Sequence, residues 1–151
     1  GDVYKRQLSG RPVEGIEALA GPDLPRALQR AEILVCLLPD TAQTRDLLDA
    51  ETLALLPRGA WIVNAGRGTL IDEEALIPAL EDGGRHAVLD VFRHEPLPPG
   101  HPFWAHPRVI VTPHVAAETR PATAAPVAAE NLRRAMAGAP LLHLVDRTRG
   151  Y

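Results

Sequence analysis

The chain has 151 residues, of which 46% are hydrophobic and 23% charged, a composition typical of one soluble globular domain. The longest apolar run, Ile33–Leu38, is too short to span a bilayer, and residues 1–7 lack the apolar stretch of a secretory signal. A net charge of -3 without a basic stripe argues against nucleic-acid binding, and the single cysteine excludes an internal disulfide. We therefore expect a cytoplasmic protein that binds neither membranes nor nucleic acid.

Short apolar runs rich in Val, Ile and Leu predict the β-strands of the fold. They lie at Glu32–Leu38, Ala60–Val63, Ala87–Phe92 and Val109–Val111. Runs of this kind, without polar alternation, are typical of strands buried on both faces of a parallel sheet.

Helical segments are predicted between and after these runs, each opened by a residue that can cap a helix or by proline. They are a segment opened by Thr41, Ala50–Leu56 after Asp49, Glu73–Asp82 after Asp72, and Pro121–Ala137. Because strands and helices alternate along the chain, the sequence predicts an α/β fold with a doubly wound parallel sheet.

Charged side chains follow the predicted strands at their carboxyl ends, where open α/β sheets bind ligands. Arg67 follows the second run, Glu95 the third and His114 the fourth. An arginine fork can bind the carboxylate of a 2-oxo acid, and an imidazole can donate a proton to the alkoxide formed by hydride attack. A carboxylate beside that imidazole favours its charged form. We further expect Gly66 and Gly68 to let the backbone approach a ligand closely.

Each of these residues taken alone also has a structural interpretation. Arg67 could be a turn residue, Glu95 a loop carboxylate paired with a neighbouring basic residue, and His114 a strand-end histidine. The combination at three strand ends favours a site. The six histidines offer no tightly spaced pair, so no metal site is expected, and Cys36 in its apolar run predicts a buried, inert thiol.

Three segments carry a resemblance to a known family. Residues Asn64–Gly68, Asp90–Leu97 and Thr112–Ala116 resemble, in order and spacing, the signature segments of the D-isomer-specific 2-hydroxyacid dehydrogenases. Residues 101–109 and the end of the chain are similar to the glyoxylate/hydroxypyruvate reductase A group of that family. The resemblance implies a Rossmann-like NAD(P)-binding domain and reduction of a small 2-oxo acid, glyoxylate or hydroxypyruvate.

The resemblance also implies roles for particular residues. Arg67 would bind the substrate, His114 would be the acid/base, and Glu95 would be its partner. Cofactor contacts would fall on Leu37, Pro39, Thr44, Ala65, Gly66, Arg67, Asp90, His114 and Ala116. Ser9 and Arg11 fall where the family meets the adenine ribose, and this hydroxyl and cation suit a 2′-phosphate, which favours NADPH over NADH.

The sequence departs from the family in lacking the Gly-x-Gly-x-x-Gly turn that holds the cofactor pyrophosphate. We therefore expect a carboxyl-terminal portion of an enzyme that is a homodimer when complete. Residues 8–140 would be a partial NAD(P)-binding domain, and 141–151 a tail returning to a catalytic domain. Residues 1–7 would be a junction sequence, which a start codon and promoter in the upstream DNA would contradict.

Two other hypotheses remain open. The chain could be a non-catalytic remnant, a dimerisation or cofactor-half module without a phosphate cradle. It could also be a doubly wound domain of another nucleotide-binding enzyme, in which case the combination of Arg67, Glu95 and His114 would be a coincidence.

Overall fold

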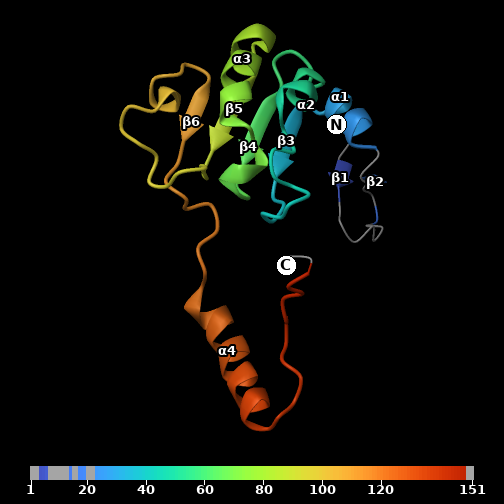
Figure 1. Ribbon diagram of the computed structural model, residues 1–151, viewed down its shortest axis with the longest axis vertical. Helices are drawn as coiled ribbons and strands as arrows, with labels where there is room; N and C mark the ends of the chain where they lie inside the picture. Colours follow the sequence, from blue (N-terminus) through green and yellow to red (C-terminus); the bar gives the residue numbers. More distant parts are fainter. Residues whose placement is uncertain (1–3, 7–13, 15–16, 20–22, 149–151) are drawn as a thin grey trace.

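A parallel sheet of four strands forms the centre of the fold (Figure 1). The computed structural model describes residues 4–6, 14, 17–19 and 23–148. The strands are β3 (Ile33–Cys36), β4 (Trp61–Asn64), β5 (His86–Leu89) and β6 (Val109–Val111), and each pairs with the next along the chain. All their carboxyl ends therefore meet at one edge. The predicted α/β class with a parallel sheet is confirmed.

The first predicted strand, Glu32–Leu38, is longer than the observed β3. Cys36 pairs with Asn64, the last residue of β4, so residues beyond it have no neighbouring strand. A second, two-stranded parallel sheet pairs β1 (Tyr4–Arg6) with β2 (Glu17–Leu19). Helix α1 (Leu24–Arg30) follows it; neither this sheet nor α1 is among the predicted elements.

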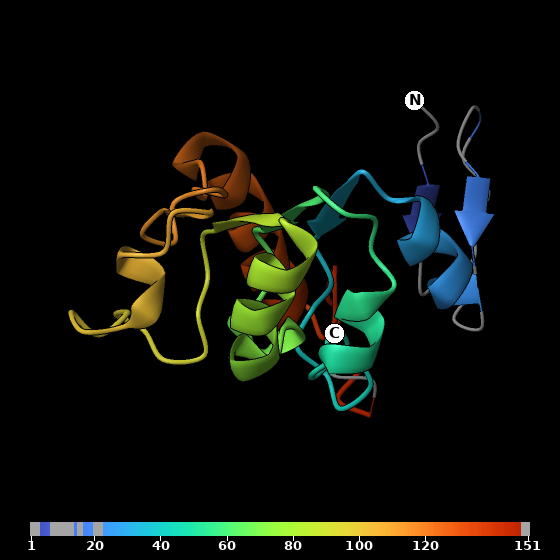
Figure 2. The same ribbon diagram turned by 90° about the horizontal axis from the view of Figure 1, so that it is seen from above.

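Two helices cover one face of the four-stranded sheet (Figure 2). They are α2 (Ala50–Ala54) and α3 (Glu73–Gly83). Their leucines pack on side chains from every second position of the strands, and Leu53, Leu76 and Ile62 are all fully buried in one cluster. The hydrophobic effect of this single layer is the main driving force for the described fold.

The predicted caps of these two helices are confirmed. Asp49 accepts a hydrogen bond from Thr52 N at 2.9 Å, and Asp72 accepts one from Glu74 N at 3.0 Å. Gly84 ends α3 in the left-handed region, at φ 61°, which glycine adopts without strain.

The opposite face of the sheet is exposed in the described part of the chain. Ile33 is 66% exposed, Val35 53% and Ile110 52%, and on the same face the ring of Trp61 stacks on that of His86 at 4.5 Å. We call Ile33, Val35, Trp61 and Ile110 the open face. The prediction that the strands are buried on both faces is wrong here, because α2 and α3 pack on the other side.

Thr41 does not cap a helix, contrary to the prediction. Residues 42–46 form turns, and the Thr41 carbonyl accepts hydrogen bonds from Thr44 N and Arg45 N, each at 3.1 Å. The Thr44 hydroxyl accepts one from Thr41 N at 2.9 Å. This short hydroxyl-closed turn uses the same residue type that would open a helix.

Helix α4 (Pro121–Met136) projects away from the sheet, and none of its residues is buried (Figure 1). The following segment runs back beside it, where Leu142 N donates to Asn131 Oδ1 at 2.8 Å and Asn131 Nδ2 donates to Leu142 O at 3.2 Å. Two short 3₁₀ helices, Gly68–Leu70 and Pro102–Trp104, lie in the loops around the sheet. None of the described helices is both long and apolar enough to cross a membrane.

Candidate active site

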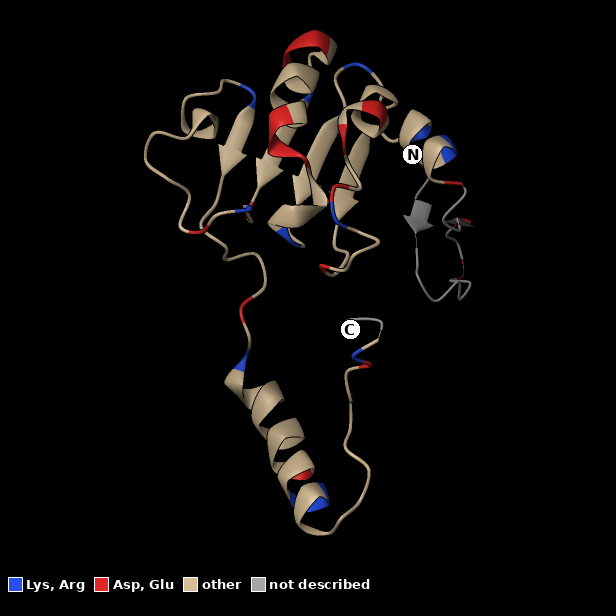
Figure 3. Ribbon diagram, in the orientation of Figure 1, with Lys and Arg blue, Asp and Glu red and all other residues tan. Residues whose placement is uncertain are grey.

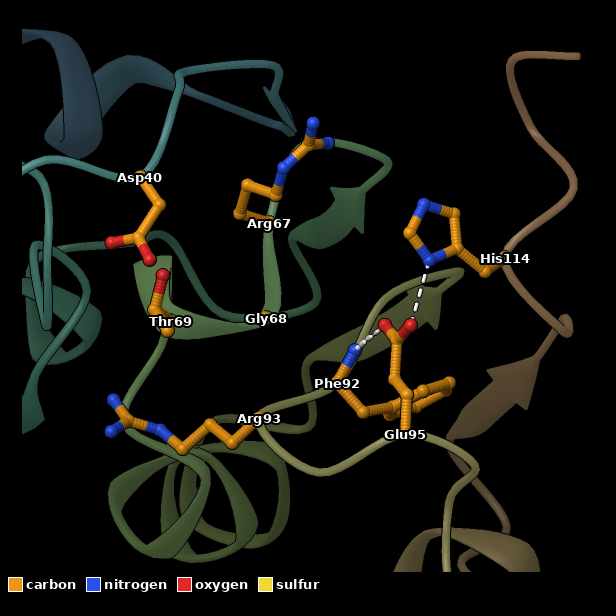
Figure 4. Close-up of a pocket in the computed structure, with 8 residues that line it drawn as sticks. All are labelled: Asp40, Arg67, Gly68, Thr69, Phe92, Arg93, Glu95 and His114. Atoms are coloured by element: carbon orange, nitrogen blue, oxygen red, sulfur yellow. Dashed lines mark hydrogen bonds and ion pairs between the residues drawn. The ribbon is translucent and has the colours of Figure 1, made fainter. Parts of the chain in front are cut away.

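The three residues singled out at the strand ends lie around one cavity. It has a volume of about 240 Å³ at the carboxyl edge of the sheet (Figure 4). Its lining residues are Asp40, Arg67, Gly68, Thr69, Phe92, Arg93, Glu95 and His114. Arg67 follows β4, Glu95 lies in the loop after β5, and His114 follows β6. Consecutive parallel strands therefore bring all three residues to the same edge of the sheet.

His114 and Glu95 form a direct pair. The His114 Nδ1 lies 2.7 Å from Glu95 Oε2, and the other carboxylate oxygen of Glu95 accepts from Phe92 N at 2.9 Å. Burial by itself would raise the pKa of the Glu95 carboxyl, but the hydrogen bonds from His114 and Phe92 outweigh it, so this pKa is lowered. An ionised carboxylate only accepts, so Nδ1 carries a proton toward Glu95 and Nε2 is left for a ligand.

Arg67 is the arginine of this cavity without a carboxylate partner in the described part of the chain. Its guanidinium is exposed and donates to Gly66 O at 2.7 Å. The second arginine, Arg93, donates twice to Ile71 O, at 2.9 and 3.1 Å, and pairs with Asp46. Arg67 can therefore present two parallel donors to an anion, whereas Nε and Nη2 of Arg93 already have partners.

The glycines beside Arg67 serve chain packing. A Cβ at Gly68 would lie 2.0 Å from the carbonyl carbon of Phe92, and one at Gly66 would lie 3.1 Å from Cys36 O. On the side where each glycine would carry a Cβ, backbone of neighbouring segments fills the space. Gly68 also lines the cavity, so the expectation that these glycines let the backbone approach a ligand stays a prediction.

Asp90 holds the turn that carries His114. Its Oδ1 accepts from Thr112 Oγ1 at 2.5 Å and from Val115 N at 2.9 Å, and its Oδ2 accepts from Ala116 N at 2.9 Å. Burial raises the pKa of the Asp90 carboxyl, but these hydrogen bonds together lower it below its ordinary value. His114 itself has φ 55°, a left-handed conformation that a non-glycine residue adopts only when its surroundings enforce it.

The residues named for cofactor contact have different surroundings. Leu37 is 69% exposed just after β3, whereas Thr44 is 1% exposed and donates its hydroxyl to Pro39 O at 2.5 Å. The Thr44 hydroxyl thus closes its own loop. Ala65 and Gly66 continue from β4, with Gly66 buried. Ser9 and Arg11 lie outside the described residues.

Sequence reasoning missed the role of Asn64. This residue is 1% exposed, and its side chain accepts from Gly66 N at 3.1 Å and donates to Arg67 O at 3.0 Å. The available signal was an amide directly after an apolar strand, since a buried amide requires partners. Also missed was Glu73, which accepts from Arg93 N at 2.9 Å and ties α3 to the loop before Glu95.

The remaining chemistry of the described residues is limited. No group of three or more His, Cys, Asp or Glu side chains among them could hold a metal ion. Cys36 packs against the core, and burial raises the pKa of its thiol to about 12, as expected for an inert cysteine. Acidic and basic positions are intermixed in the loops at the carboxyl edge (Figure 3).

A parallel α/β sheet with an arginine and a histidine–carboxylate pair at its carboxyl edge is consistent with a nucleotide-binding domain of the dehydrogenase class. The model of the family described as D-isomer specific 2-hydroxyacid dehydrogenase, NAD binding domain, matches residues 3–116. The chain belongs to this family, and its fold is the Rossmann-like NAD-binding domain.

Individual relatives agree. Glyoxylate/hydroxypyruvate reductase A of Salmonella heidelberg is 44% identical over 139 residues, which are 91% of this chain and 45% of the relative. A D-isomer specific 2-hydroxyacid dehydrogenase from Xanthobacter autotrophicus Py2, solved with NADPH and MES, has 49% identity and a TM-score of 0.95 over 99% of this chain and 63% of its own. The NADPH-dependent glyoxylate/hydroxypyruvate reductase of Sinorhizobium meliloti, solved with NADP and sulfate, has 37% identity and a TM-score of 0.92. The match covers 99% of this chain and 49% of the relative. The chain spans about half the length of the curated relatives it matches.

Proposed function

We propose that this chain carries the arginine and acid/base half of an NAD(P)H-dependent reductase. The reaction would convert glyoxylate or hydroxypyruvate to the 2-hydroxy acid, the D isomer where a new stereocentre forms, within a longer polypeptide. The observation that carries the proposal is the 2.7 Å pair of His114 and Glu95, which lines the same cavity as Arg67, an arginine with no carboxylate partner among the described residues. The names of the Salmonella and Sinorhizobium relatives support glyoxylate and hydroxypyruvate as the substrate class.

In this proposal Arg67 binds the substrate carboxylate through two parallel N–H groups. A reduced nicotinamide, when bound, supplies the hydride to the carbonyl carbon. His114 gives the proton on Nε2 to the carbonyl oxygen, which gains negative charge as the hydride adds. Glu95 fixes the ring of His114 and stabilises its protonated form until the proton is transferred. One hydride and one proton thus turn the ketone or aldehyde into the alcohol, and His114 is left neutral.

The residues present fit the nicotinamide end of the cofactor. Asp90 Oδ2 accepts one hydrogen bond, from Ala116 N, and an ionised carboxylate oxygen can accept another, such as one from a carboxamide. The sequence contains no Gly-x-Gly-x-x-Gly turn, so the phosphate cradle is not part of this proposal. We infer that the 151-residue chain alone does not turn over.

The test is a chimera that joins residues 8–151 to the amino-terminal half of the Sinorhizobium meliloti reductase, assayed by NADPH oxidation with glyoxylate. His114→Ala should lower kcat by about 10²–10⁴, the usual contribution of general acid–base catalysis. Arg67→Ala should raise the KM for glyoxylate, because the carboxylate loses its charge-assisted hydrogen bonds.

Two matched variants serve as controls. His143 is exposed and left-handed like His114, with φ 55° for both, and Arg133 is an exposed arginine on α4. His143→Ala and Arg133→Ala should leave kcat and KM within about twofold, as expected for surface changes away from a site. A folded, inactive chimera would support the non-catalytic alternative instead.

We also propose NADPH as the preferred cofactor and a homodimer as the complete protein, in the cytoplasm. The Xanthobacter and Sinorhizobium relatives were solved with NADPH and NADP respectively, which supports the cofactor choice. In the chimera, Arg11→Ala should weaken NADPH more than NADH, and equal weakening of both would contradict the role of Arg11. Light scattering of the chimera tests the dimer.

A further inference from the structure

Two residues with buried polar side chains are joined through their backbones at the carboxyl ends of β4 and β5. Asn64 is 1% exposed and Asp90 is 4% exposed, and Asp90 N donates to Asn64 O at 3.0 Å. Burying an amide and a carboxylate is unfavourable unless hydrogen bonds replace those lost to water. The partners of these two side chains therefore show what they do in the fold.

Asn64 closes the turn that carries Arg67. Its Oδ1 accepts from Gly66 N at 3.1 Å and its Nδ2 donates to Arg67 O at 3.0 Å. Both ends of one amide are thus used on the same short turn, so the backbone from which the Arg67 side chain starts is fixed relative to β4.

Asp90 does the same for the turn that carries His114. Its carboxylate is bonded to Thr112 on one side of His114 and to the N–H groups of Val115 and Ala116 on the other. His114, between these contacts, has φ 55°. The carboxylate therefore holds a backbone conformation that a residue other than glycine adopts only when its surroundings enforce it.

We propose that Asn64 and Asp90 are a pair of positioning residues that together set the separation of the Arg67 guanidinium and the His114 imidazole. The inference rests on the proposed function and deepens it. A 2-oxo acid presents its carboxylate and carbonyl at a fixed spacing, so both groups of the protein must meet it at once. Misplacement by about 1 Å can cost about 10²-fold in rate. Neither Asn64 nor Asp90 lines the cavity, and for Asp90 the positioning role is additional to the carboxamide contact proposed above. The hydrogen bond between their backbones keeps the two turns together.

The test uses isosteric variants in the chimera described above. Asn64→Asp replaces the donor to Arg67 O with an oxygen, and should raise the KM for glyoxylate by about tenfold or more while kcat stays within about threefold, because binding by Arg67 is lost. Asp90→Asn places an amide N–H against the backbone N–H of either Val115 or Ala116. It should lower kcat by about tenfold or more with little change in the KM for glyoxylate, because the His114 imidazole is displaced. A rise in the KM for NADPH in place of the loss of kcat would overturn the inference for Asp90.

Double variants separate positioning from general stability. If Asn64 acts through Arg67, Asn64→Asp should have almost no further effect in the Arg67→Ala background, and Asp90→Asn almost none in the His114→Ala background. The control is Thr52→Val, which removes the hydroxyl from the α2 cap far from the cavity and should act additively in both backgrounds. The inference would be overturned if Asn64→Asp had as large an effect in the Arg67→Ala background as in the unmodified chimera, or if Asp90→Asn did so in the His114→Ala background.

Hydrogen exchange provides a measurement that needs no turnover. The amides of Val115 and Ala116 should be protected in the chimera, and one of them should exchange at least about tenfold faster in Asp90→Asn, since the variant replaces one of their two acceptor oxygens with an amide donor. Thr112→Val, which removes one of the three hydrogen bonds to Asp90, gives a milder variant if Asp90→Asn does not fold. An inactive chimera with these protected amides would contradict the proposed function alone, whereas unprotected amides would contradict the positioning role.

Discussion

Gly68 is the residue whose size the site tolerates least. A Cβ there would lie 2.0 Å from the carbonyl carbon of Phe92 and 2.5 Å from Arg93 N, and both are backbone atoms that cannot rotate away. We expect Gly68→Ala to destabilise the chain by about 1–3 kcal/mol or more through overpacking. Urea unfolding followed by circular dichroism measures this. The control is Gly100→Ala, which has nothing within 4 Å and should change stability by less than about 1 kcal/mol; equal effects would contradict the prediction.

Cys36 should be chemically silent in the native state. Burial raises the pKa of its thiol to about 12, so less than about one molecule in a thousand carries the thiolate at pH 8. We expect no reaction with a thiol reagent at pH 8 until urea unfolds the chain, when one equivalent reacts. The absorbance of the released reagent measures this, and rapid labelling of the folded chain would refute the expectation.

Part of the candidate site could be predicted because its residues are ionisable and lie a few positions beyond apolar strands. Arg67 and His114 stand out for this reason, and the parallel sheet then brings them to one edge. The contribution of Asn64 could not be predicted in this way, because its partners are backbone groups of the next residues and depend on the turn that forms. The space beside Gly68 likewise depends on the tertiary approach of Phe92, which the local sequence does not encode.

Among the helices, α2 carries a cap that depends on pH. Asp49 accepts from Thr52 N at 2.9 Å, and the backbone and side-chain hydrogen bonds from Thr52 lower the pKa of its carboxyl. A lowered pKa in the folded state means that the stabilisation is present above the unfolded pKa of about 3.9 and is lost as the pH falls through the folded value.

We therefore expect Asp49→Asn to have a flatter dependence of stability on pH. Asparagine caps helices about as well as aspartate, so the variant should lie within about 0.5 kcal/mol of the parent chain at pH 7. Between pH 5 and pH 3 it should lose less stability than the parent chain. Urea unfolding at three pH values measures this, and parallel curves would show that the cap does not titrate in this range.

Helices α2 and α3 were predictable because an aspartate precedes each and a proline or glycine follows. The Thr41 segment was not, because a threonine hydroxyl closes a short turn as readily as it caps a helix, and only the position of Thr44 decides between them. The extent of β3 depends on its neighbour, since the apolar run continues beyond the last residue of β4 that can pair with it.

At the scale of the whole molecule, the two faces of the sheet should respond differently to substitution. Val35 is 53% exposed on the open face, whereas the adjacent Leu34 packs against the core. We expect Val35→Thr to change the free energy of unfolding by less than about 0.5 kcal/mol. Leu34→Thr should cost more than about 1 kcal/mol, since it removes packed methyl groups and buries a hydroxyl. Urea unfolding of the isolated chain compares them, and similar costs would contradict the assignment of the faces.

The open face should also be visible to a hydrophobic dye. Val35→Thr reduces its apolar area, so the native chain should bind less dye, while the unfolded chains bind equally little. An unchanged dye signal would place the binding elsewhere, for example on α4. The sequence could not reveal this face, because an apolar strand residue looks the same whether a helix covers it or not.

The order of the strands has a consequence for how the molecule is made. Because β3, β4, β5 and β6 lie side by side in the order in which they are synthesised, each strand after β3 can pair with one that has already left the ribosome. The turn that carries Arg67 can form while the segment with His114 is still to be translated. His114 is then the last of the three residues around the cavity to be delivered, and its pair with Glu95 can form only after β6 has joined the sheet.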